Sequence, residues 1–96
     1  MQLKLTPKAR ADLDAIWEYS VRQWNIEQAE TYLASLGKTM QLLIENPGLG
    51  TKIDHIKNGY QKFPAASHLL IYQTTPTAIE IVRVLHKSMD VTNALG

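Results

Sequence analysis

Two residues near the C-terminus have the types and the spacing of a general base and its orienting group. His86 and Asp90 stand four positions apart, where a run of aliphatic residues ends. The pattern places no obvious nucleophile beside them, so a structural hydrogen bond that holds the C-terminal tail is the favoured interpretation. His55, His68 and His86 lack the regular close spacing of a zinc site. We therefore expect no metal site.

Basic residues gather locally, although the chain as a whole is balanced in charge. Ten Lys and Arg stand against nine Asp and Glu, for a net charge of +1. This balance disfavours nucleic-acid binding as the main role, because such binding neutralises many phosphates at once. Lys57 and Lys62 nevertheless fall in a segment, residues 52–68, whose only acidic residue is Asp54. A solvated loop is the favoured interpretation and an anion site is the alternative.

Arg83 lies among aliphatic residues in a predicted strand, residues 78–86, and His86 and Lys87 follow it. By strict alternation its side chain would share one face with three neighbours, namely Ile79, Ile81 and Leu85. The planar guanidinium suits both an internal ion pair, with Glu45 or another carboxylate, and contact with a partner. Both roles remain open from the sequence.

The first half of the chain has the pattern of a short strand and two helices. Residues 2–5 alternate polar and apolar side chains, which is typical of a strand. Thr6 and Pro7 predict the start of an amphipathic helix over residues 7–23. Asn25, with Gln28 as a capping-box partner, predicts a second helix, which Pro47 ends. The short connection between them predicts an antiparallel helical hairpin.

The second half changes to an extended pattern. Residues 46–59 are rich in Gly, Asn and charge, and predict a loop with room for one helical turn. A strand over residues 60–63 is expected to end at Pro64. Residues 68–73 and 78–86 predict a hairpin, and the tail a last helical turn. The expected fold is therefore α+β, with an N-terminal strand, a helical hairpin and a three-stranded antiparallel sheet, in one domain over residues 1–96.

Composition and the aromatic residues narrow the kind of protein. The chain has no cysteine and no apolar run near the roughly 20 residues that span a bilayer, so a cytoplasmic protein without a membrane segment is expected. Trp17 falls on the apolar stripe of the first helix, whereas Trp24 falls at the predicted helix turn. A core position and an exposed anchor for a protein partner are equally balanced for Trp24.

The chain resembles the ParE family of the RelE/ParE toxin superfamily over roughly residues 3–90. The resemblance is carried by LTPKARADLDAIWEYSVRQW, ENPGLG, KFPAASHLLIYQ and IEIVRVLHKSMD, and within them by Phe63-Pro64, His68 with Tyr72, Arg83 to His86, and Met89-Asp90. It implies a toxin that is neutralised by a ParD-like antitoxin and that inhibits DNA gyrase by binding it. It implies no catalysis, no cofactor, and no sequence-specific binding of nucleic acid by the toxin alone.

RelE relatives in the same superfamily instead cut mRNA in the ribosome, which is the alternative function. Such cleavage needs clustered cations and a general acid or base. The candidates, Lys57, Lys62, Arg83, His86 and Lys87, form a thin set, and no tyrosine follows Arg83. The sequence therefore favours a toxin that is not an enzyme. Ser88, where relatives often carry a basic residue, leaves open a third possibility, a member that binds its antitoxin but has lost toxicity.

The antitoxin is expected at the apolar grooves of the helical hairpin and the edge of the sheet, because a segment that folds on binding commonly adds a helix or strand there. The residues expected to contact the target or partner are Trp24, Lys57, Lys62, Arg83, His86 and Lys87.

Overall fold

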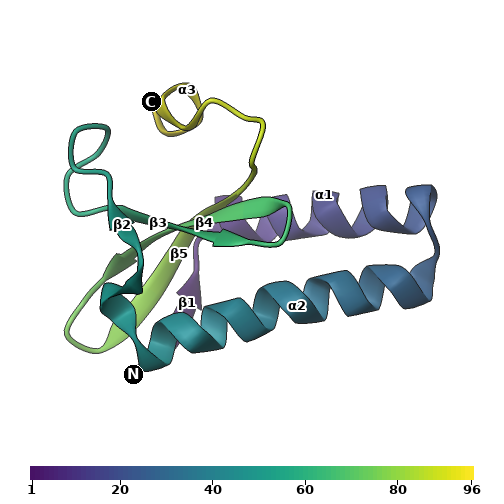
Figure 1. Cartoon of the computed structure of the whole chain (residues 1–96), viewed down its shortest axis with the longest axis horizontal. Helices are drawn as coiled ribbons and strands as arrows, with labels where there is room; N and C mark the ends of the chain where they lie inside the picture. Colours follow the sequence, from purple (N-terminus) through teal and green to yellow (C-terminus); the bar gives the residue numbers. More distant parts are fainter.

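The computed structural model describes all of residues 1–96 as a helical hairpin packed on a small sheet (Figure 1). The elements are β1 (Gln2–Leu5), α1 (Pro7–Gln23), α2 (Ile26–Glu45), a 3₁₀ turn (Pro47–Leu49), β2 (Thr51–Lys52), β3 (Gln61–Ala65), β4 (His68–Thr74), β5 (Ala78–His86) and α3 (Val91–Leu95). The α+β class and the order of elements are thus confirmed. No helix is both long and apolar enough to cross a membrane.

The sheet has five strands rather than the expected three, in the order β1-β5-β4-β3-β2. The N-terminal strand joins it by pairing in parallel with β5, from Gln2 opposite Ala78 to Leu5 opposite Ile81. The other three pairings are antiparallel. Strand β2 escaped prediction because two residues are too few to show an alternating pattern.

Both helices begin at the predicted N-cap residues, although the Gln28 side chain does not return a capping-box bond to the Asn25 amide. The Thr6 hydroxyl accepts a hydrogen bond from the Ala9 amide at 3.0 Å and donates one to the Val82 carbonyl at 2.7 Å. The Asn25 side chain accepts from the Gln28 amide at 2.7 Å. The first cap therefore does two tasks, because it starts α1 and also ties that start to β5, on which the helix packs.

The main core lies between the hairpin and one face of the sheet. Leu36 and Leu43 of α2 meet Leu70 of β4 and Ile81 of β5, and all four are at most 1% exposed. A smaller cluster of Ile53, Ile71 and Leu85 lies on the other face, under α3 and the 53–60 loop. Figure 1 shows α3 and α2 on opposite sides of the sheet.

A bulge in β5 decides which face Arg83 occupies. Ile71 pairs with Arg83 but the next residue, Tyr72, pairs with Ile81, so Val82 is left without a partner in β4. One extra residue reverses the alternation. Arg83 consequently shares the α3 face with Leu85, while Ile81 faces the hairpin. The prediction that Arg83 shares a face with Ile79 and Ile81 is therefore wrong, and its expected neighbour Leu85 is right.

Strand β3 does not end at Pro64, as was expected, but runs through it to Ala65. Pro64 pairs with Leu69 of β4, while β2 reaches only Gln61 and Lys62 on the other side. Proline is tolerated in a strand where the missing amide faces an open edge. Pro64 therefore lies beyond the end of β2, where β3 is the edge strand of the sheet.

The turn after α2 is held to the sheet by Tyr72, whose side chain is buried. Its hydroxyl donates to the Pro47 carbonyl at 2.9 Å and accepts from the Gly50 amide at 2.8 Å. A Cβ atom at Gly50 would collide with this hydroxyl. Burial raises the pKa of Tyr72 above its ordinary value, so the phenol stays protonated and can donate.

Candidate partner-binding site

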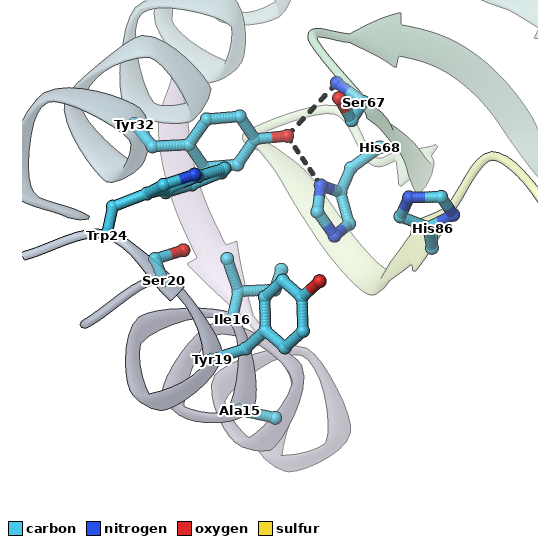
Figure 2. Close-up of a pocket in the computed structure, with 9 residues that line it drawn as sticks. All are labelled: Ala15, Ile16, Tyr19, Ser20, Trp24, Tyr32, Ser67, His68 and His86. Atoms are coloured by element: carbon cyan, nitrogen blue, oxygen red, sulfur yellow. Dashed lines mark hydrogen bonds between the residues drawn. The ribbon is translucent and has the colours of Figure 1, made fainter. Parts of the chain in front are cut away.

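A pocket of about 380 Å³ opens between α1, the turn to α2 and the ends of β4 and β5. Figure 2 shows the side chains around it. Apolar atoms dominate the side formed by α1 and Trp24, whereas the side formed by the sheet carries imidazoles. The lining residues are Ala15, Ile16, Tyr19, Ser20, Trp24, Tyr32, Ser67, His68 and His86.

Tyr32 and His68 form a hydrogen-bonded pair in the lining of this pocket. The Tyr32 hydroxyl lies 2.6 Å from Nδ1 of His68 and accepts a bond from the Ser67 amide at 3.0 Å. The other ring nitrogen of His68 points toward the space beside Ile16 and Tyr19 (Figure 2). Thus α2 fixes the orientation of a histidine that belongs to the sheet.

His86 lies directly opposite His68 in the β4–β5 pairing. Their rings meet edge to face, with centroids 5.3 Å apart. Nδ1 of His86 lies 2.7 Å from the Ser88 hydroxyl and accepts from the Ser88 amide at 3.1 Å. The expected bond between His86 and Asp90 is absent, because Asp90 instead caps α3 through the amides of Thr92 and Asn93. The two residues do not act as a base and its orienter.

The environment of His68 disfavours its charged form. Burial lowers the pKa of His68 below its ordinary value, the neighbouring His86 lowers it further, and Asp12 partly opposes both effects. A half-buried imidazole pays for desolvation when it is protonated, and a second imidazole gives it no counter-charge. His68 is therefore neutral around physiological pH.

Trp24 is 53% exposed at the junction of the two helices, which favours the expectation of an exposed anchor over a core position. Its ring lies 6.4 Å from that of Tyr32 and borders a second, shallower depression on α2. Large aromatic side chains in such positions are common anchors for protein partners. Trp24 and His86 are the two predicted contact residues that border the pocket.

Arg83 is committed to contacts within the fold. Its Nε and Nη2 donate to the Asp12 carboxylate at 2.8 and 3.0 Å, and its Nη1 donates to the Ala94 carbonyl at 3.2 Å. The same carboxylate accepts from the Val84 amide at 2.9 Å. The hydrogen bonds to Asp12 raise the pKa of Arg83. The partner of Arg83 is thus Asp12 of α1 and not Glu45.

The remaining predicted residues lie apart from the pocket. Lys57 is exposed in the 53–60 loop, with its ammonium 5.9 Å from the Tyr60 ring centroid. Lys62 pairs with Ile71, which places it on the α3 face of the sheet with Arg83. Lys87 is exposed just after β5. The structure therefore does not gather the six predicted residues into one patch, because Lys62 and Arg83 lie on the opposite face of the sheet from His86.

Tyr32 and His68, the hydrogen-bonded pair of the pocket, are among the lining residues that the sequence did not single out as contacts. Both were visible, Tyr32 among the aromatics of the hairpin and His68 among the three histidines. Their meeting depends on the crossing of α2 over the end of β4, for which no short motif exists. No group of three or more His, Asp or Glu side chains is placed to hold a metal ion.

Known proteins with similar sequences are bacterial toxins. Residues 3–91 match the family model of the ParE toxin of the type II toxin–antitoxin system parDE. The toxin ParE1 of Caulobacter vibrioides is 39% identical over 93 residues, which cover 97% of this chain and 96% of the relative. The toxin ParE1 of Mycobacterium tuberculosis is 42% identical over 88 residues, covering 91% and 90%.

Solved structures share the fold. A chain from the chromosomal ParDE system of P. aeruginosa has a TM-score of 0.75 and 25% identity, over 90% of this chain and 95% of that one. A YoeB/ParE toxin from Agrobacterium tumefaciens shares the fold, with a TM-score of 0.60 over 90% of this chain and 98% of that one, at 19% identity. The chain is therefore a toxin of the type II toxin–antitoxin class. Within that class it belongs to the ParE family.

Proposed function

We propose that this ParE toxin inhibits DNA gyrase by binding it and is neutralised by a ParD-like antitoxin. Membership of the ParE family supports the proposal, and the similar structure from P. aeruginosa comes from a ParDE system. The toxin acts in the cytoplasm as one domain over residues 1–96, without turnover and without a cofactor. The antitoxin covers the grooves around Trp24 and the helical hairpin.

The engagement of Arg83 is the observation that carries the proposal. Cleavage of RNA requires cations that are free to bind phosphates and to stabilise a transition state rich in negative charge. The guanidinium of Arg83 is instead held by Asp12 and Ala94. Lys62 shares its face, but it lies two strands away, or about 10 Å at the usual strand spacing. His86 faces the hairpin, on the other side of the sheet.

The Tyr32–His68–His86 cluster is the one feature that favours the alternative, a RelE-like mRNA endonuclease. It contains groups that can transfer protons. The cluster lies on the opposite face from Arg83 and Lys62, so these two cations are not placed to bind a phosphate held there. This separation makes the alternative weaker than inhibition by binding.

Purified toxin distinguishes the two functions directly. We would add it in a concentration series to a gyrase supercoiling reaction and, in parallel, to a cell-free translation reaction. The proposal predicts loss of supercoiling with a stoichiometric rather than a catalytic dose dependence, and translation that continues. The cognate antitoxin should restore supercoiling. Cut mRNA with unaffected gyrase would instead establish the endonuclease.

A matched pair of variants tests whether the hairpin end makes the contacts. Trp24→Ala removes an exposed aromatic side chain, and Leu49→Ala removes an apolar side chain of similar exposure, 47%, outside the pocket. We expect the first variant to weaken neutralisation by the antitoxin at least tenfold and the second to leave it unchanged. Equal effects would place the antitoxin elsewhere.

A further inference from the structure

The pocket beside Tyr32 has an apolar side and a side made of imidazoles. Ile16 and Tyr19 of α1 form the first, and His68 and His86 of the sheet form the second (Figure 2). Its volume of about 380 Å³ is at the small end of the range for ligand pockets, ~300–1,000 Å³. It can therefore take one or two side chains of a partner rather than a whole helix.

The hydrogen bonds around His86 determine which nitrogen carries its proton. The Ser88 amide donates to Nδ1, so Nδ1 must be the unprotonated nitrogen of the neutral ring. The proton then resides on Nε2. His86 consequently presents an N–H donor on the side of the ring away from the Ser88 turn.

The same reasoning applies to His68. The Tyr32 oxygen already accepts from the Ser67 amide, and its own proton has Nδ1 of His68 as an acceptor 2.6 Å away. In the arrangement where the Tyr32 hydroxyl donates to Nδ1, neutral His68 carries its proton on Nε2, the nitrogen that points into the pocket (Figure 2). We assign this tautomer to His68. Two neighbouring rings thus offer N–H donors, and neither offers a free ring acceptor.

We propose that this pocket binds the carboxylate of a Glu or Asp side chain from a partner protein, with Nε2–H of His68 and of His86 as donors. An apolar residue next to that carboxylate packs against Ile16 and Tyr19. The inference deepens the proposed function. It rests on that function in one respect, because it requires that the toxin binds a protein partner. It adds the chemistry that selects one segment of that partner.

Other occupants fit the pocket less well. A transition metal needs the lone pair of Nε2, which both rings use to hold a proton. A phosphate group favours fixed cations, whereas no Lys or Arg is among the residues that line the pocket, and the guanidinium of Arg83 is held by Asp12. A carboxylate has two acceptor oxygens, one for each of the two N–H donors, and the apolar side favours a peptide over a free small acid.

Binding of a carboxylate must raise the pKa of His68, because an opposite charge stabilises the imidazolium. The titratable and charged groups that face His68 are Tyr32 from α2, Tyr19 and Asp12 from α1, and His86 from β5. Only Asp12 among them is anionic near neutral pH. The affinity for the acidic partner should therefore increase as the pH falls through the pKa that His68 has in the complex.

The test is an NMR titration of the full chain labelled with ¹⁵N, observing the imidazole nitrogens. The probes are two capped peptides, acetyl-Leu-Glu-Leu-amide and acetyl-Leu-Gln-Leu-amide, and free acetate. We expect the acidic peptide to move the signals of both pocket histidines and to raise the pKa of His68 by about one unit. The Gln peptide and acetate should bind at least fivefold more weakly, and His55 should not respond.

Tyr32→Phe removes the hydroxyl that fixes the tautomer of His68, and Tyr60→Phe is the matched control on the other face. We expect a threefold or greater loss of affinity for the acidic peptide in the first variant only. Equal binding of the Glu and Gln peptides, or equal losses in both variants, would overturn the inference. The readout does not involve gyrase, so a toxin that binds the peptide but spares gyrase would refute only the proposed function.

Discussion

Replacing Asp12 by asparagine should destabilise the toxin more than any other change of a single charge. Asp12 accepts two hydrogen bonds from Arg83 and one from the Val84 amide. The Val84 amide lies on the edge of β5 that β1 does not reach, because β1 pairs with β5 only as far as Ile81. Both side chains of the pair are largely buried, at 17% and 18% exposed. The substitution leaves the guanidinium without its counter-charge and converts one acceptor into a donor.

The magnitude follows from what remains buried. Removing one partner of a fully buried ion pair costs about 3–5 kcal/mol, and partial exposure reduces that cost to about 2–3 kcal/mol. For a domain of this size the loss corresponds to a Tm lower by about 10–20 °C. Urea unfolding followed by tryptophan fluorescence and by circular dichroism measures it, with coincident transitions as the check on two-state behaviour.

The matched control is Asp14→Asn, on the same helix but exposed and in no salt bridge. It should change the free energy of unfolding by less than about 0.5 kcal/mol. A double-mutant cycle of Asp12→Asn with Arg83→Gln should give a coupling energy of at least about 1 kcal/mol. If Asp12→Asn is no more destabilising than Asp14→Asn, the pair does not hold α1 to β5 and the reasoning fails.

Three further outcomes follow from the structure. Gly50→Ala should destabilise the fold by about 2 kcal/mol, because the added Cβ would displace the Tyr72 hydroxyl. Gly48→Ala has open space around the added Cβ and should cost less than about 1 kcal/mol. Chemical denaturation of both variants compares the two losses. The pKa of His68 is lowered in the folded state, so as the pH falls the unfolded chain takes up the proton first. The contribution of His68 to stability should therefore be complete above about pH 6.5 and decline as the pH falls toward the pKa of the folded state. A Tm series from pH 7.5 to 5, compared between the wild type and His68→Gln, isolates the contribution of His68. Trp24→Ala should lower the free energy of unfolding by no more than about 2–3 kcal/mol, because the half-exposed side chain keeps only roughly 100 Å² from water at about 25 cal/mol per Å². A larger loss in urea unfolding would mean that Trp24 supports the hairpin rather than a partner.

The helices could be predicted from the sequence because their signals are local. The Thr6 and Asn25 caps act within three residues of each helix start, and the apolar stripes repeat every three or four residues. The β4–β5 hairpin was predictable for a similar reason, since a short turn joins two runs of β-branched and aliphatic residues. Local chemistry therefore determines these elements with little help from the rest of the fold.

The sheet edges and the site depend on contacts that are distant in sequence. The parallel pairing of β1 with β5 joins residues more than 70 positions apart, and so does the bond between Arg83 and Asp12. The bulge at Val82 changes the face of Arg83 without any glycine or proline to mark it. Only the assembled fold places Tyr32 against His68, so a list of basic residues could not reveal which ones share a site.

The position of Asp12 affects how mutations in this toxin should be interpreted. Its carboxylate holds Arg83 and the edge of β5, and it also raises the tendency of His68 to take up a proton. A variant of Arg83 that loses toxicity would therefore be explained first by a weakened fold and an altered pocket, and only then by a lost contact with the target. Because Trp24 and His86 lie at the surface and hold no comparable ion pair, toxicity lost at those positions in a stably folded variant is the stronger evidence for a binding surface.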